Sequence, residues 1–138
     1  LQVAQNKIVR FILNLDHRSR ITQTELDRAG VLSVSDRARQ LTLNHMFNVH
    51  HQIAPSYLCN NFVNLARRYN TRGTKSNYVT ASAHSIANNN FSIIGCKEWN
   101  TLPESLKLLP SKETSKVNVK KFLKAQAHLK EANDYVYY

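Results

Sequence analysis

Glycine, proline and cysteine are all scarce in this sequence, and each shortage excludes a class of protein. The 138 residues include three glycines, three prolines and two cysteines, whereas 42% of the residues are hydrophobic. Such a composition excludes a collagen-like repeat, low-complexity disorder and a small fold held by disulfides. Because Cys59 and Cys96 are far apart and form no Cys-x-x-Cys motif, they predict reduced thiols in an intracellular chain.

Long apolar runs are missing as well. No run approaches the roughly 18 residues that a membrane-spanning helix needs, so we expect no membrane partner. The first fifteen residues contain Lys7 and Arg10, unlike the apolar core of a signal peptide. The sequence starts at Leu1, already in helical periodicity, which suggests a piece of a longer protein.

The common catalytic motifs do not occur either. The sequence has no Gly-x-x-x-x-Gly-Lys loop, no Gly-x-Gly-x-x-Gly, no Gly-x-Ser-x-Gly and no His-Glu-x-x-His, and its carboxylates are dispersed. His45, His50 and His51 have no acidic or cysteine neighbour and are expected at a surface or an interface. We therefore expect no catalytic residues, no metal and no cofactor.

Acidic residues are few, and the resulting charge indicates the kind of partner. Nine Asp and Glu stand against nineteen Lys and Arg, which gives a net charge of +10. The segment from Arg37 to Lys97 contains seven basic residues and no carboxylate. A basic chain suits an acidic protein or an anionic membrane, but an acid-free segment of this length favours a polyanion such as RNA or DNA.

The spacing of apolar residues predicts a mostly α, single-domain protein of five to seven helices. The basic middle, residues 67–90, is expected to be an irregular loop with up to two short strands. Thr22 and Glu25 have the spacing of a capping box, and Gly30 is expected to end that helix. Asn88-Asn89-Asn90 is expected to cap the helix that follows it. The predicted helices cover residues 1–15, 22–30, 33–54 (the longest), a short stretch after Pro55, 91–101, 104–109 and a last helix from Ser115.

Three of these helices have a predicted buried side. We expect the first to bury Leu1, Ala4, Ile8, Phe11, Ile12 and Leu15, and the third to bury Val34, Ala38, Leu41, Val49 and Ile53. In the last helix Val119, Phe122, Leu123 and Leu129 form the apolar side. Residues 91–103 hold the one tryptophan and are apolar nearly all round, so this helix is expected at the centre, with Trp99 as a core residue rather than a base-stacking one.

Basic residues gather in three places that could contact phosphate. These are an arc of the first helix with the connection after it, a segment where Tyr69 and Tyr78 flank Arg72 and Lys75, and a lysine stripe on the last helix. The alternatives are a solvated helix face in the first and third places and a polar loop in the second. The residues predicted to contact nucleic acid are Lys7, Arg10, Arg18, Arg20, Arg67, Arg68, Tyr69, Arg72, Lys75, Tyr78, Lys116, Lys120, Lys121 and Lys124.

Three short elements resemble the C-terminal region of reverse transcriptases from jockey-like, LINE-type non-LTR retrotransposons. They are Leu1-Gln2-Val3-Ala4-Gln5-Asn6-Lys7, Ile53-Ala54-Pro55-Ser56-Tyr57-Leu58, and Trp99-Asn100-Thr101-Leu102-Pro103 followed by the helix from Ser115 to Lys124. The chain departs from the family's pattern at Val31-Leu32-Ser33, where Trp-x-Pro is common, and at Val79-Thr80-Ala81, where a proline is common.

The resemblance implies a thumb-like part at residues 1–66 and a C-terminal module at residues 67–138 that holds template RNA or target DNA during target-primed reverse transcription. It also implies upstream reverse-transcriptase domains as partners, since the catalytic palm with its Tyr-x-Asp-Asp motif is absent from this sequence. We expect a non-enzymatic, nuclear module that binds nucleic acid, with RNA favoured over DNA. The alternative is a protein-interaction or dimerisation domain derived from a retroelement.

Overall fold

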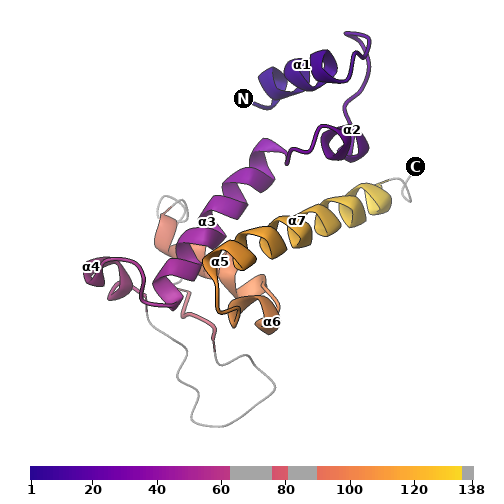
Figure 1. The fold of residues 1–138 in the computed structure, drawn as a ribbon. Helices are drawn as coiled ribbons and strands as arrows, with labels where there is room; N and C mark the ends of the chain where they lie inside the picture. Colours follow the sequence, from indigo (N-terminus) through magenta and orange to yellow (C-terminus); the bar gives the residue numbers. More distant parts are fainter. Residues whose placement is uncertain (63–75, 81–89, 135–138) are drawn as a thin grey trace. The chain divides into compact units, whose positions relative to one another are not determined.

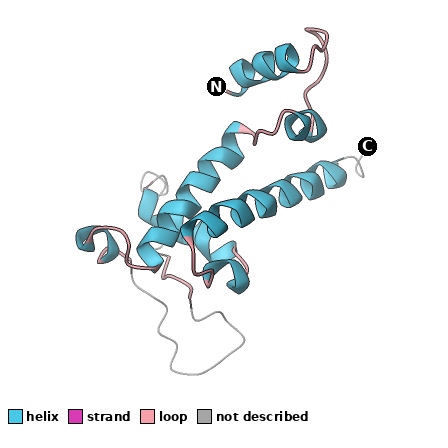
Figure 2. Ribbon diagram, in the orientation of Figure 1, coloured by secondary structure: helices cyan, strands magenta, loops and turns pink. Residues whose placement is uncertain are grey.

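The computed structural model describes residues 1–62, 76–80 and 90–134, and these residues form helices and loops (Figures 1 and 2). The mainly α prediction is confirmed, with seven helices in the described part of the chain. No helix among the described residues has the length and apolarity to cross a membrane. The helices are α1 (Gln2–Ile12), α2 (Gln23–Arg28), α3 (Val34–His50), α4 (Ser56–Cys59), α5 (Phe91–Thr101), α6 (Glu104–Lys107) and α7 (Lys112–Asp134).

The chain forms two compact units. One consists of Leu1–Ala38 with Lys120–Tyr138, and the other of Arg39–Val119. Helices α3 and α7 each contribute residues to both units. The predicted division at residues 66 and 67 lies outside the described residues and stays a prediction.

The first unit contains α1, α2 and the second part of α7. Its buried side chains include Val9, Leu26, Leu32 and Leu123. The predicted capping box of α2 is confirmed, since the Thr22 amide donates to the Glu25 carboxylate at 2.9 Å. Gly30 follows the helix at φ +72°, a left-handed conformation that glycine adopts without a steric cost.

Helix α1 is shorter than predicted and buries a different side. It ends at Ile12 because the chain turns at Asn14, which has φ +51°, and the Leu15 amide donates to the Arg10 carbonyl oxygen at 2.9 Å. This pattern is a Schellman motif. Val9 is buried, whereas the predicted apolar side is largely exposed, namely Leu1, Ala4, Ile8, Phe11 and Ile12.

The second unit has a core built on α3 and α5. Helix α5 is central as predicted, and Trp99 is 1% exposed, which agrees with its predicted place in the core. Gly95 lets the two helices approach closely, because a Cβ atom there would lie 2.8 Å from Met46 Sδ. The core side chains of this unit are Leu43, Met46, Phe47, Val49, Tyr78, Ile93, Cys96, Trp99, Leu102 and Val119.

The ends of α5 also follow the prediction. Asn90 caps the helix, its side chain accepting a hydrogen bond from the Ser92 amide at 3.2 Å. The helix stops at Thr101, since the residue before Pro103 is disfavoured in the helical region. Pro103 then precedes α6, a single turn that ends at Lys107, where one or two turns were expected between Glu104 and Leu109.

Several further expectations need correction or completion. The stripe predicted for α3 is wrong at Ala38, Leu41 and Ile53, which are exposed, because α5, α6 and the first turns of α7 cover the Leu43 and Met46 side instead. Helix α7 begins at Lys112 rather than Ser115, and with 23 residues it exceeds the 17 of α3. Leu129 at its far end is exposed.

The helix after Pro55 is a single turn, and the described residues of the basic middle, 76–80, contain no strand.

Candidate nucleic-acid interface

Helix α1 is attached to its unit through polar side chains. The Val34 amide donates to Gln2 Oε1 at 3.0 Å, and Gln5 Nε2 donates to the Leu32 carbonyl oxygen at 2.7 Å. These bonds lie on the same side of the helix as the buried Val9. The opposite side, with Lys7 and Phe11, therefore faces away from the unit.

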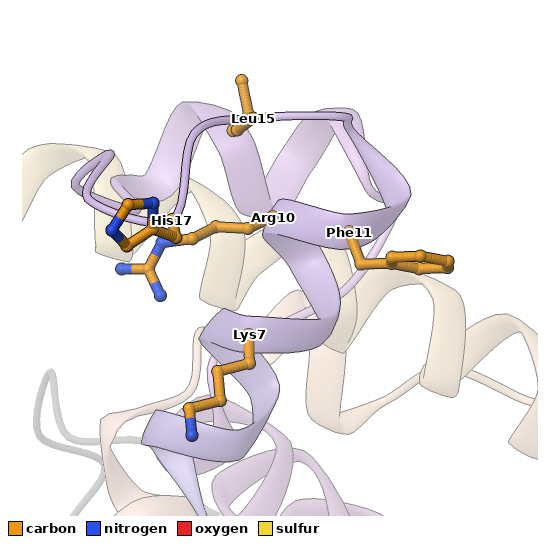
Figure 3. Close-up of a pocket in the computed structure, with 5 residues that line it drawn as sticks. All are labelled: Lys7, Arg10, Phe11, Leu15 and His17. Carbon is orange, nitrogen blue, oxygen red and sulfur yellow. The ribbon is translucent and has the colours of Figure 1, made fainter.

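A hollow of about 430 Å³ lies at the C-terminal end of α1. Its lining residues come from the last two turns of the helix and from the turn that follows Asn14. The Schellman motif returns the chain alongside the helix, which places Leu15 and His17 beside Arg10. Figure 3 shows the five residues of this α1 hollow: Lys7, Arg10, Phe11, Leu15 and His17.

Hydrogen bonds orient the basic groups of the hollow. Arg10 Nε donates to the Ser19 carbonyl oxygen at 2.8 Å, so the guanidinium is held against the connection after α1. In Figure 3 it lies beside the imidazole of His17. His17 Nδ1 is also 3.4 Å from a carboxylate oxygen of Asp16, which partly offsets the positive potential at that end of the hollow. Lys7, at the other end, is exposed.

The structure thus brings together only part of the basic arc predicted for α1 and the connection after it. Lys7 and Arg10 share the hollow, whereas Arg18 and Arg20 are exposed but do not line it. The sequence interpretation missed Phe11 and Leu15, which it placed in the core, and His17, which it treated as part of a polar connection. The asparagine at position 14 is the signal that could have revealed the hollow, because Asn often ends a helix in the left-handed conformation.

The four lysines predicted on α7 do not play one role. Lys116 and Lys121 are exposed. Lys120 Nζ donates to the Gly30 carbonyl oxygen at 3.0 Å, and Lys124 Nζ lies 2.6 Å from a carboxylate oxygen of Asp27. Two of the four therefore hold α7 to the α2 region, which corrects the view of a uniform stripe open to phosphate.

Asp27 is the anchor of that contact. His128 Nε2 lies 2.5 Å from its second carboxylate oxygen. Burial alone would raise the pKa of Asp27, but the hydrogen bonds and charges of Lys124 and His128 outweigh it and hold the pKa below its usual value. The carboxylate is therefore ionised at neutral pH and neutralises charge within the unit.

The carboxylates from Asp16 to Glu131 all have partners within the fold. Each of them accepts a hydrogen bond or forms an ion pair with a described residue. Glu25 and Glu113, for example, have pKa values held below the usual value by hydrogen bonds, Glu25 chiefly from the Thr22 side chain and Glu113 chiefly from its own backbone amide. Asp16 and Glu113 are themselves exposed and keep their negative charge, but the exposed lysines and arginines outnumber them.

Tyr78 lies in the core, which corrects the prediction that its ring stacks on a base. It is 3% exposed, and its ring packs against Phe62, His50 and Trp99. Its hydroxyl oxygen is 3.2 Å from His50 Nδ1, and burial raises the pKa of Tyr78 to about 12. The ring therefore offers no open face to a ligand. The other predicted residues of this segment, Arg67, Arg68, Tyr69, Arg72 and Lys75, lie outside the described residues.

His50 at the end of α3 and His51 directly after it have structural partners. His50 contacts Tyr78, and His51 Nε2 is 3.2 Å from the Lys107 carbonyl oxygen. No group of three His, Cys, Asp or Glu side chains that could hold a metal gathers among the described residues. Comparison with known proteins gives no further information, since no family model, no curated protein and no solved structure matches this chain.

Proposed function

We propose that this chain is a nucleic-acid-binding module that holds template RNA or target DNA, as the C-terminal region of a LINE-type reverse transcriptase would. The observation that carries the proposal is that acidic side chains have partners within the fold whereas many basic side chains face solvent. The carboxylates from Asp16 to Glu131 have partners within the fold, while Lys7, Arg18, Arg20, Lys116 and Lys121 are exposed on a chain of net charge +10. Phosphate backbones supply the complementary charge.

Backbone contacts would supply most of the affinity, because each neutralised phosphate releases condensed counterions. RNA is favoured over duplex DNA if an aromatic ring of the protein takes part, since unpaired bases are common in RNA loops. The module itself carries out no chemistry in this proposal. Upstream reverse-transcriptase domains would supply the polymerase, and action on target DNA implies a nuclear location.

A titration of the wild-type protein tests the proposal. A structured RNA, a single-stranded DNA and a duplex DNA are each titrated at two salt concentrations. We expect binding that weakens steeply as salt rises, and a further loss when Lys7, Arg18 and Arg20 are changed to Gln. The matched control is Lys97→Gln, an exposed lysine of α5 outside the predicted site. Absence of binding to all three ligands at low salt would refute the proposal.

A protein-interaction or dimerisation domain is the second candidate. The observation that favours it is the exposed apolar side of α1, where Leu1 is 96% and Phe11 86% exposed. Such a stripe is an ordinary docking surface for another helix. Sedimentation of the wild-type protein over a range of concentrations tests self-association, and Ile8→Glu should abolish it if α1 forms the interface.

A further inference from the structure

The α1 hollow combines cations and an open aromatic ring. Lys7 and Phe11 are four residues apart on α1 and therefore neighbours on its surface, and Arg10 lies beside them. In Figure 3 the Lys7, Arg10 and His17 side chains extend to one side of the helix end, and the Phe11 ring extends to the other. A ligand that suits the hollow has an anionic part and a flat apolar part.

Phe11 is available because the fold keeps it outside. The bonds from Gln2 and Gln5 to the backbone at Val34 and Leu32 fix which side of α1 packs inward. Turning the helix to bury the ring would break both bonds. The Phe11 ring, 86% exposed, therefore stays at the surface as long as these two hydrogen bonds hold α1 in place.

The anion belongs between Lys7 and Arg10, on the side of Arg10 that lies away from His17 and Asp16. His17 already has a carboxylate oxygen of Asp16 at 3.4 Å, and the amide of Arg18 donates to the same oxygen at 2.8 Å. That negative charge disfavours a phosphate directly at His17. Arg10 is orientated by its bond to Ser19, so little conformational freedom is lost when it meets a ligand.

We propose that the α1 hollow binds a short unpaired stretch of nucleic acid, with phosphates at Lys7 and Arg10 and a base stacked on Phe11. The volume of about 430 Å³ is within the usual range for small organic ligands, roughly 300 to 1,000 Å³. A paired base is stacked within its duplex, so the ring selects single strands. This inference rests on the proposed function and deepens it by naming the form of nucleic acid that α1 recognises.

The test compares Phe11→Ala with Tyr57→Ala. Tyr57 is an exposed aromatic residue, 68% exposed, that does not line the hollow, so it controls for the loss of any surface ring. Each variant is titrated with an oligothymidine strand and with a blunt duplex of equal length, and circular dichroism checks the fold. We expect Phe11→Ala to weaken binding of the strand by roughly fivefold to a hundredfold and to change duplex binding by less than about twofold. Tyr57→Ala should bind both ligands as the wild type does.

A second pair of variants tests the phosphate contact. Lys7→Gln should weaken binding of the strand and make the affinity less dependent on salt. The control is Lys130→Gln, which changes an exposed lysine of α7 outside the hollow and should have a smaller effect on both the affinity and its salt dependence. If the wild type binds the strand but Phe11→Ala binds it equally well, the α1 site is wrong while the proposed function stands. Equal losses for strand and duplex also reject the stacked base. If the wild type binds neither ligand at low salt, the proposed function fails together with this site.

Discussion

The indole Nε1 of Trp99 donates a hydrogen bond to the carbonyl oxygen of Ser76 at 2.8 Å. The next residue, Asn100, pairs with Tyr78, accepting from its amide and donating to its carbonyl oxygen, each at 2.9 Å. The two adjacent residues of α5 thus fasten the backbone at Ser76 and Tyr78. This gives the Trp-Asn pair a structural purpose beyond filling the core.

Trp99→Ala should unfold the second unit. The substitution removes a fully buried ring and leaves the Ser76 carbonyl oxygen without its donor, and truncation of a buried tryptophan costs about 3 to 5 kcal/mol. That is a large part of the stability of a typical domain. Urea unfolding followed by circular dichroism measures the loss. A variant with unchanged stability and lost nucleic-acid binding would show instead that Trp99 acts on the ligand.

Asn100→Ala tests the attachment of the Tyr78 backbone separately. Both hydrogen bonds to Tyr78 disappear, and unpaired backbone groups that are partly buried cost about 1 to 3 kcal/mol. The control is Asn61→Ala, an exposed asparagine, which should stay within about 0.5 kcal/mol of the wild type. Equal stability of the two variants would mean that the Asn100 bonds add nothing to the fold.

Capping residues and turn residues were predictable from the sequence, because they act on their own neighbours. Thr22 with Glu25, Gly30 and Asn90 all occupy the predicted places. The central position of α5 was also predictable, since a helix that is apolar nearly all round has no side suited to water.

The buried side of α1 and α3 depends on tertiary partners and could not be read from periodicity. Helix α3 carries apolar residues on more than one side, and its contacts with α5, α6 and α7 select Leu43 and Met46 over Leu41. In the candidate site, a lysine that pairs with Asp27 looks the same in sequence as one that faces solvent. The α1 hollow could not be predicted from the periodicity of the sequence, because the apolar stripe that contains Phe11 predicts that this side chain is buried.

Gln52→Gly should stabilise the protein. Gln52 has φ +54° after α3, and the Ile53 amide donates to the Asn48 carbonyl oxygen at 2.8 Å, as in a Schellman motif. A side chain in this left-handed conformation is disfavoured by roughly 1 kcal/mol, which glycine relieves. Differential scanning calorimetry should show a higher melting temperature. The reverse change, Gly30→Gln at φ +72°, should lower it, and a rise there would contradict the argument.

Stability should fall in mild acid through His50. Burial, followed by the charge of His51, lowers the pKa of His50 below its ordinary value of 6.5, although Glu104 opposes this shift. The unfolded chain therefore binds the proton more readily between the lowered pKa and about 6.5, so the free energy of unfolding decreases as pH falls through that window. Above it, the contribution of His50 is constant.

His50→Gln isolates this contribution, because glutamine still offers a hydrogen-bond partner to Tyr78 but does not titrate. The difference in unfolding free energy between about pH 7.5 and about pH 5.5 should be smaller in the variant than in the wild type. An identical difference in both proteins would assign the acid sensitivity to other groups.

The lysines of α7 should separate into two functional pairs. Lys116 and Lys121 are exposed, so changing each to Gln should leave the fold intact, whereas Lys120 and Lys124 bind Gly30 and Asp27. If the exposed pair contacts phosphates, its removal should reduce the slope of log affinity against log salt by about 1.4 on a single strand or 1.8 on a B-form duplex.

The double variant Lys120→Gln with Lys124→Gln should instead lower the melting temperature, because an ion pair at 2.6 Å and a backbone contact are lost, and should change the slope less. An unaltered slope in the exposed pair would leave those lysines as a solvated helix face and would shift support towards the interaction-domain candidate.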